Sequence, residues 1–152
     1  GTLDPFTFEG KAKLVADMQN AQFAKFSMGV CDFWPVESET LAKLFEVTYG
    51  GDWTAEKVDK AGERIFNIQR MYNIMVGFEG REDTLPQRFF KEILKDGPPK
   101  DHPMTEDAFN ATMQEYYAYR GWDKEGRPTI ERLKELEVEP ELIDRYQAVT
   151  GM

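Results

Sequence analysis

The chain has 152 residues, of which 41% are hydrophobic and 31% are charged, a balance typical of a globular domain with its own core. Its 28 acidic and 19 basic side chains give a formal charge of −9, which repels nucleic-acid phosphates and anionic lipids. No apolar run of about 18 residues or signal-peptide pattern occurs. We therefore expect no nucleic-acid partner, no membrane partner and a cytoplasmic location.

The chain contains one cysteine, Cys31, and one histidine, His102. This count excludes an internal disulfide, a Cys/His zinc site and a bundle di-iron site within the chain. The sequence begins Gly-Thr-Leu-Asp-Pro without methionine, so residues 1–2 are interpreted as a tag remnant, or the chain as a processed product. We expect one all-α domain over residues 1–152 and interpret it as a fragment of a longer protein.

Hydrophobic periodicity predicts about six or seven helices around one core, with no strand. The first helix is expected over residues 11–26. A second begins at Ser38 and ends at the Gly50-Gly51 break. The clearest apolar stripe runs over residues 54–75, where Thr54 is suited to be the N-cap.

Shorter helices are predicted after residue 80. Thr84 is expected to cap a segment with Pro86 in its first turn. Four apolar side chains of that segment are predicted to face inward: Phe89, Phe90, Ile93 and Leu94. Residues 96–103 are predicted to form a loop, because Gly97-Pro98-Pro99 cannot continue a helix. The remaining helices are expected from Thr105 to Gly121, from Pro128-Thr129 through Leu136, and around Leu142, Ile143 and Tyr146.

Several polar positions are candidates for binding, and each also has a structural explanation. Arg64, Asn67 and Asn73 lie among apolar neighbours, which favours hydrogen bonds tying the helix to a loop over contacts to a ligand. His102 lies in a proline-rich polar loop and is expected to be solvated. Residues 121–126 are expected to form a turn that folds Trp122 back on the core, because the segment lacks the ligands of a calcium loop.

Cys31 follows the predicted end of the first helix, and the residues alone leave two interpretations open. A lone cysteine usually packs as a small hydrophobic side chain. Alternatively, Gly29 permits a turn whose backbone approaches a flat ligand while Cys31 presents a thiolate. A thiolate of this kind can ligate an iron–sulfur cluster, but three further ligands would have to come from elsewhere.

Nearly the whole chain resembles the C-terminal region of the aldehyde ferredoxin oxidoreductase family, the tungsten- or molybdenum-pterin enzymes of anaerobes. The resemblance is strongest in Gly62-Glu63-Arg64-Ile65-Phe66-Asn67-Ile68-Gln69-Arg70-Met71-Tyr72-Asn73. Shorter matching segments are residues 10–15, 29–31, 77–78, 83–89, 115–123, 126–129 and 133–136. Their order and spacing agree with the family, which chance matches to short motifs do not produce.

The resemblance implies a role for Gly29, Val30 and Cys31, which match the last three residues of the family's Asp-x-x-Gly-Leu-Cys motif. In the family this cysteine is the fourth ligand of a 4Fe-4S cluster, and an upstream Cys-x2-Cys-x3-Cys group supplies the other three. Cys31 is therefore the expected metal ligand, and residues 29–31 the expected pterin contact. Phe26 stands where the family has an aspartate that accepts pterin hydrogen bonds, so the residues favour cluster ligation over pterin binding.

The chemistry implied by the resemblance is oxidation of an aldehyde to a carboxylic acid at a tungsten- or molybdenum-bis-pterin centre. Electrons then pass through the cluster to ferredoxin. Upstream domains of the same polypeptide would be partners, the isolated chain would be inactive, and an exposed domain interface could cause self-association. We expect this interface to be an apolar patch comprising Phe23, Phe26, Phe33 and Trp34. The alternative is a stand-alone helical binding or scaffolding module with a purely structural Cys31.

Overall fold

The computed structural model describes residues 3–31 and 33–152, and within them the secondary structure is helical with no strand, as predicted. Gly1 and Thr2, the interpreted tag remnant, lie outside the described residues. The α-helices are α1 (Lys11–Ser27), α2 (Ser38–Tyr49), α3 (Ala55–Met75), α4 (Arg88–Lys91), α5 (Glu106–Arg120), α6 (Ile130–Glu135) and α7 (Pro140–Thr150). Two short 3₁₀ turns are η1 (Gly80–Glu82) and η2 (Pro98–Asp101). None of these helices is both long and apolar enough to cross a bilayer.

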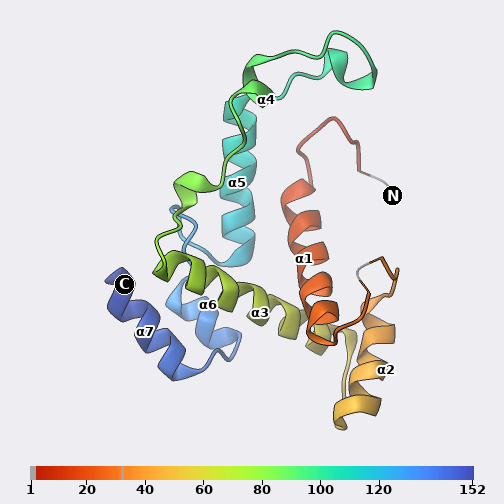
Figure 1. Cartoon of the computed structure of the whole chain (residues 1–152), viewed down its shortest axis with the longest axis vertical. Helices are drawn as coiled ribbons and strands as arrows, with labels where there is room; N and C mark the ends of the chain where they lie inside the picture. The colour runs from red at the N-terminus through yellow and green to blue at the C-terminus, as the bar shows by residue number, and fades with distance from the viewer. Residues whose placement is uncertain (1–2, 32) are drawn as a thin grey trace.

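Helix α3 crosses the molecule and contacts α1, α2 and α7 (Figure 1). The Thr54 hydroxyl caps its start by accepting a hydrogen bond from the Lys57 backbone N–H at 3.3 Å. Its end at Met75 precedes Gly77, whose positive φ of 99° is disfavoured for other residues. Both ends of this helix therefore agree with the prediction from local sequence.

The structure divides the predicted core into three apolar clusters placed along α3. The first joins α3, α6 and α7, the second joins α1, α5 and the turn after α5, and the third joins α1, α2 and the start of α3. The most completely buried apolar members include Met71, Leu133 and Tyr146 in the first, Ala16 in the second, and Leu41 and Val58 in the third. The turn after α5 is packed as predicted, because Trp122 is only 7% exposed.

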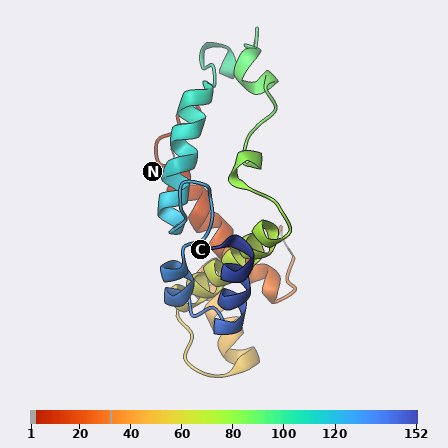
Figure 2. The ribbon, with the colours of Figure 1, turned by 90° about the vertical axis from the view of Figure 1, so that its left-hand side faces the viewer.

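The segment between η1 and α5 differs from the prediction. Its helix α4 has four residues, and its N-cap position is Gln87 rather than Thr84. Phe89, Ile93 and Leu94 are exposed, so the expected inward-facing stripe is wrong; Phe90 contacts Phe109, with ring centroids 5.5 Å apart. Figures 1 and 2 show the reason, since the segment projects past the N-terminal end of α5 and no other helix covers it. The predicted loop over 96–103 contains η2.

Tyr146 provides a stability test within the first cluster. Its side chain is fully buried, and its hydroxyl has no hydrogen-bond partner among the described residues. Leaving a buried hydroxyl unpaired costs about 1–3 kcal/mol. We therefore expect Tyr146→Phe to raise the free energy of unfolding by about 1 kcal/mol, measured by urea denaturation at pH 7. Tyr72→Phe is the control because Tyr72 is 61% exposed, and its stability should be unchanged. A destabilised Tyr146→Phe variant would contradict the unpaired state.

The same residue should affect unfolding at high pH. Burial raises the pKa of the Tyr146 hydroxyl above its ordinary value of about 10. The unfolded chain then loses this proton at a lower pH than the folded chain, so the contribution to stability is complete below about pH 10 and is lost above it. The alkaline loss of stability should be less steep in Tyr146→Phe than in the unchanged chain. An equally steep loss of stability in both proteins would contradict the raised pKa of Tyr146.

Candidate functional site

The turn that carries Cys31 begins where α1 ends. The Gly29 N–H donates to the Phe26 carbonyl at 2.9 Å, and Gly29 has a positive φ of 68°. Among the described residues, no atom beyond Gly29 and its two chain neighbours lies within 4 Å of the position that a Cβ would take at Gly29. Conformation rather than crowding therefore favours glycine here, and the surface in front of this backbone is open.

Buried Lys25 is hydrogen-bonded to Trp34, in the segment that follows this turn. Its side chain is 4% exposed and its ammonium donates to the Trp34 carbonyl at 3.3 Å. The Trp34 N–H in turn donates to the Cys31 carbonyl at 3.2 Å. Cys31 itself is exposed, so the structure does not bury it as a small core residue. Its thiol is accessible to a ligand or partner.

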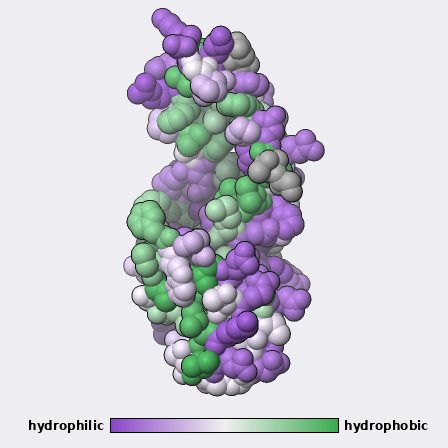
Figure 3. All heavy atoms as spheres, turned by 90° about the vertical axis from the view of Figure 1, so that its right-hand side faces the viewer, coloured by the Kyte–Doolittle hydropathy of each residue, from purple (hydrophilic) through white to green (hydrophobic). Residues whose placement is uncertain are grey.

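The apolar patch expected beside the turn is present in part. Phe26, Phe33 and Trp34 are 48%, 93% and 43% exposed. Phe23 is half-buried and packs edge-on against Phe66, with ring centroids 4.9 Å apart. Figure 3 views the molecule from the right-hand side of Figure 1. It shows hydrophobic side chains gathered in stretches on that face. The exposed members of the patch flank Cys31 in sequence.

Among the described residues, Cys31 is not accompanied by enough donor side chains to hold a metal ion. Over residues 3–31 and 33–152, no group of three His, Cys, Asp or Glu side chains is placed to hold a metal ion. His102 is exposed in its loop, as predicted, and its ring stacks on Phe6 at 4.4 Å. Local sequence gave no sign of this contact, because Phe6 is distant in the chain. A cluster at Cys31 therefore requires ligands from outside the described residues.

The polar residues of α3 have separate roles. Asn67 accepts from the Trp122 indole N–H at 2.7 Å and donates to the Glu63 carbonyl at 3.0 Å. Arg64 donates to the Leu136 carbonyl and pairs with Glu137. These two residues tie the helix to other segments, as predicted. Asn73 differs, because its side chain lines a cavity and makes no hydrogen bond to the described residues.

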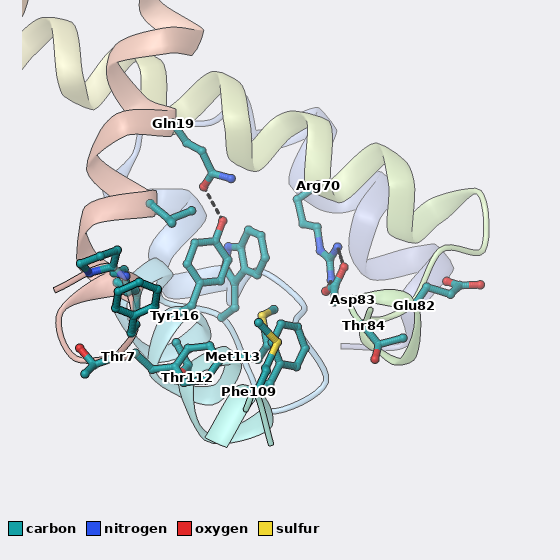
Figure 4. A pocket seen from close by; sticks show the side chains of 18 of the residues that line it. Thr7, Gln19, Arg70, Glu82, Asp83, Thr84, Phe109, Thr112, Met113 and Tyr116 are labelled. Atoms are coloured by element: carbon teal, nitrogen blue, oxygen red, sulfur yellow. Dashed lines mark hydrogen bonds and ion pairs between the residues drawn. The ribbon is translucent and has the colours of Figure 1, made fainter. Parts of the chain in front are cut away.

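That cavity is the second candidate site, and sequence reasoning missed it. It has a volume of about 870 Å³ and is bounded by residues 5–8, α1, α3, α5, residues 82–84, Pro99 and residues 102–104 (Figure 4). Its walls carry aromatic and apolar side chains, including Phe66, Phe109, Met113, Tyr116 and Trp122. Phe109, Met113 and Tyr116 lie on α5, but Phe66 and Trp122 come from other segments, so no local pattern could have grouped all five.

An ion pair closes the α3 side of this cavity. Arg70 donates two hydrogen bonds to the Asp83 carboxylate, at 3.0 and 2.5 Å, and one to the Gly126 carbonyl at 2.9 Å. Asp83 also accepts from the Tyr117 hydroxyl at 2.7 Å. Burial, together with this hydrogen bond, raises the pKa of the Tyr117 hydroxyl. The network fixes residues 79–84 and the turn after α5 against α3.

A buried arginine lies behind the α1 wall. Arg120 is 1% exposed and donates to four oxygens, none of which is a carboxylate. These acceptors are the Ala16 carbonyl, Gln19 Oε1, Asn20 Oδ1 and the Tyr116 hydroxyl. The guanidinium also lies 4.2 Å from the Phe66 ring centroid. Its charge is therefore shared among neutral dipoles and aromatic rings.

Comparison with known proteins identifies relatives of this chain. Residues 1–138 match the sequence model of a family described as aldehyde ferredoxin oxidoreductase, domains 2 & 3. The tungsten-containing aldehyde ferredoxin oxidoreductase of Pyrococcus horikoshii is 32% identical over 141 residues, which are 90% of this chain and 23% of that protein. The protein of the same description from Pyrococcus furiosus is 33% identical over 131 residues, covering 84% of this chain and 21% of that protein. The chain thus spans less than a quarter of their length.

One solved structure shares the fold. The active-site complex BamBC of benzoyl coenzyme A reductase, in complex with 1,5-dienoyl-CoA, matches with a TM-score of 0.76 at 19% identity. The match covers 99% of this chain and 22% of that chain. At this identity the similarity concerns the arrangement of the helices alone.

Proposed function

Because this chain belongs to the aldehyde ferredoxin oxidoreductase family, we propose that it contributes Cys31 as one ligand of a 4Fe-4S cluster. The enzyme containing it would oxidise an aldehyde to a carboxylic acid and pass the electrons through the cluster to ferredoxin. The observation that carries this proposal is the exposed Cys31 thiol on the glycine turn at the end of α1. A thiolate in an accessible position is what cluster ligation needs.

The surroundings of Cys31 support the proposal in two ways. The open space at Gly29 leaves the backbone of residues 29–31 free to lie against a flat ligand, and we propose this backbone as a contact for a tungsten- or molybdenum-bis-pterin. The exposed Phe26, Phe33 and Trp34 would pack against other domains of the same polypeptide. Phe26 has no hydrogen-bonding side-chain group, so pterin recognition at its position would depend on packing.

The cofactors would supply the redox chemistry, and this chain would position the Cys31 sulfur for the cluster. Lys25 fixes the turn through the Trp34 carbonyl, which would hold the Cys31 sulfur at a set distance from α1. Burial of the sulfur by the adjoining apolar patch would tune the cluster potential, since solvent exposure is one of its determinants. Aldehyde-activating residues would lie outside this chain, so the chain alone would be inactive.

The test is made on the natural polypeptide that contains this sequence, purified without oxygen. Cys31→Ala is expected to lose the intact four-iron cluster, measured as iron and sulfide per protein and as the EPR signal of the reduced cluster. Ser27→Ala is the matched control, because it alters the end of the same helix and removes one hydroxyl bonded to the Ala24 carbonyl. The control should keep its cluster. A complete, redox-active cluster in Cys31→Ala would overturn the ligand assignment.

A further inference from the structure

The cavity between α1, α3 and α5 has the dimensions and walls of a small-molecule site. Its volume of about 870 Å³ lies within the range of about 300–1,000 Å³ that ligand pockets occupy. Phe66 and Trp122 lie parallel within 3°, with ring centroids 6.0 Å apart, and Tyr116 meets Trp122 edge-on. Such faces suit a flat apolar or aromatic ligand.

The acidic groups of this cavity lie away from α1. Asp83 accepts two hydrogen bonds from Arg70 and one from Tyr117, so Arg70 neutralises its charge. The Glu82 carboxylate accepts the Glu79 backbone N–H at 2.6 Å and keeps its negative charge. Both acids lie across the cavity from α1 (Figure 4), so the charge that a ligand meets on the α1 side is set by the basic side chains.

Two basic groups on the α1 side lack an acidic partner among the described residues. Lys11 is half-buried, lines the cavity and forms no ion pair with any of them. Arg120 lies behind the wall and is bonded only to neutral oxygens. An uncompensated charge in a poorly solvated region acts over several ångströms. The α1 side of the cavity is therefore electropositive.

Gln19 lines the cavity and is hydrogen-bonded to Arg120 behind the wall. Its Oε1 accepts from both the Tyr116 hydroxyl and the Arg120 guanidinium, each at 2.6 Å. This double acceptance fixes the amide, so the Nε2 group is turned away from Tyr116 toward the space between α1 and α3 (Figure 4). Nε2 has no partner among the described residues and is available to donate. Lys11 and Gln19 share one face of α1, because they are eight residues apart.

We propose that this cavity binds an aromatic monocarboxylate. Its ring lies against Phe66 and Trp122, and its carboxylate lies on the α1 side, within reach of Gln19 and Lys11. The proposal does not rest on cluster ligation, because the cavity is built on the N-terminal half of α1 and Cys31 follows its C-terminal end. The two assignments can therefore fail separately.

The test is calorimetric titration of the 152-residue chain with 2-naphthoate and with 2-naphthamide, which has the same shape without the charge. We expect naphthoate to bind at least about tenfold more tightly, because a hydrogen bond to a charged group is stronger than one to a neutral group. Equal affinities, or no binding of naphthoate, would overturn the proposal.

Two variants and one control locate the site. Lys11→Met should weaken naphthoate binding about three- to tenfold and leave naphthamide unchanged. Lys13→Met is the control, since Lys13 lies outside the cavity and pairs with Asp17 at 2.5 Å; it should have no effect. Val15→Trp, at a cavity-lining position that is 44% exposed, should abolish binding of both ligands while the thermal unfolding midpoint stays close to that of the unchanged chain. Equal weakening by the two lysine variants, or full binding by Val15→Trp, would contradict the assignment.

Discussion

Replacing Gly62 by alanine is expected to lower the free energy of unfolding by about 3 kcal/mol or more. A Cβ at this position of α3 would lie 1.9 Å from the Asn20 carbonyl oxygen and 3.1 Å from the Ala24 nitrogen. Both atoms belong to the backbone of α1, so no side-chain rotation relieves the clash. The two helices would have to separate along their contact, and Phe66 and Asn67 of α3 would move with them.

The sign of this effect separates packing from helix propensity. Alanine in a helix interior is favoured over glycine by about 1 kcal/mol, so an uncrowded Gly62 would give a more stable variant. Ala61→Gly is the matched control at the adjacent position and should cost about 1 kcal/mol. Urea denaturation measures both, and the Gly62→Ala melting temperature should fall by roughly 6–12 °C. A stabilised Gly62→Ala variant would contradict the close approach of α1 and α3.

The boundaries of α3, α5 and α6 were predictable from the sequence because they depend on neighbours in the chain. The side chains of Thr54, Thr105 and Thr129 each accept a hydrogen bond from the backbone N–H three residues later, as an N-cap does. Gly121 ends α5 in the left-handed conformation, where glycine is favoured. These interactions are local and survive any change in the tertiary arrangement.

Features that depend on distant contacts were not predictable. The pattern of Phe89, Ile93 and Leu94 favoured a buried helix, but burial requires another element opposite, and the structure supplies none. The cavity likewise depends on side chains from α1, α3 and α5 meeting in space. One local signal was available, because Arg120 falls four residues after Tyr116 and so shares its helix face. That spacing places the two side chains together, whereas the burial of Arg120 depends on its acceptors Ala16, Gln19 and Asn20 in α1.

The candidate site also has one feature that the sequence predicted and one that depends on contacts between distant residues. The position of Cys31 came from the resemblance of residues 29–31 to a motif, whereas its exposure depends on contacts that bring Trp34 back to the end of α1. The tie between Lys25 and the Trp34 carbonyl, which fixes that fold, joins residues nine positions apart and has no sequence signature. Whether Cys31 ligates a cluster stays a prediction for the experiment above.

Asp83→Asn is expected to cost about 2–3 kcal/mol of unfolding free energy. The Arg70 and Asp83 side chains are 12% and 23% exposed, so water replaces little of the lost pairing. Asparagine has the same size, but it turns an amide N–H₂ group toward the guanidinium or the Tyr117 hydroxyl and leaves a buried charge without its counter-ion. The segment 79–84 should loosen first, and faster amide exchange at the hydrogen-bonded Glu82, Asp83 and Thr84 N–H groups would report it.

A double-mutant cycle distinguishes the ion pair from simple packing. Tyr117→Phe removes one hydrogen bond to the same carboxylate and should cost about 1 kcal/mol. Arg70→Met and Asp83→Asn should each cost more than this, whereas the double variant should cost less than the sum of the two, because the charge left unpaired in one variant is absent from the other. Strictly additive costs would mean that the two side chains are not coupled. The Tyr117–Asp83 hydrogen bond and the close approach of the Gly80 backbone to the Glu125 carbonyl would then hold residues 79–84.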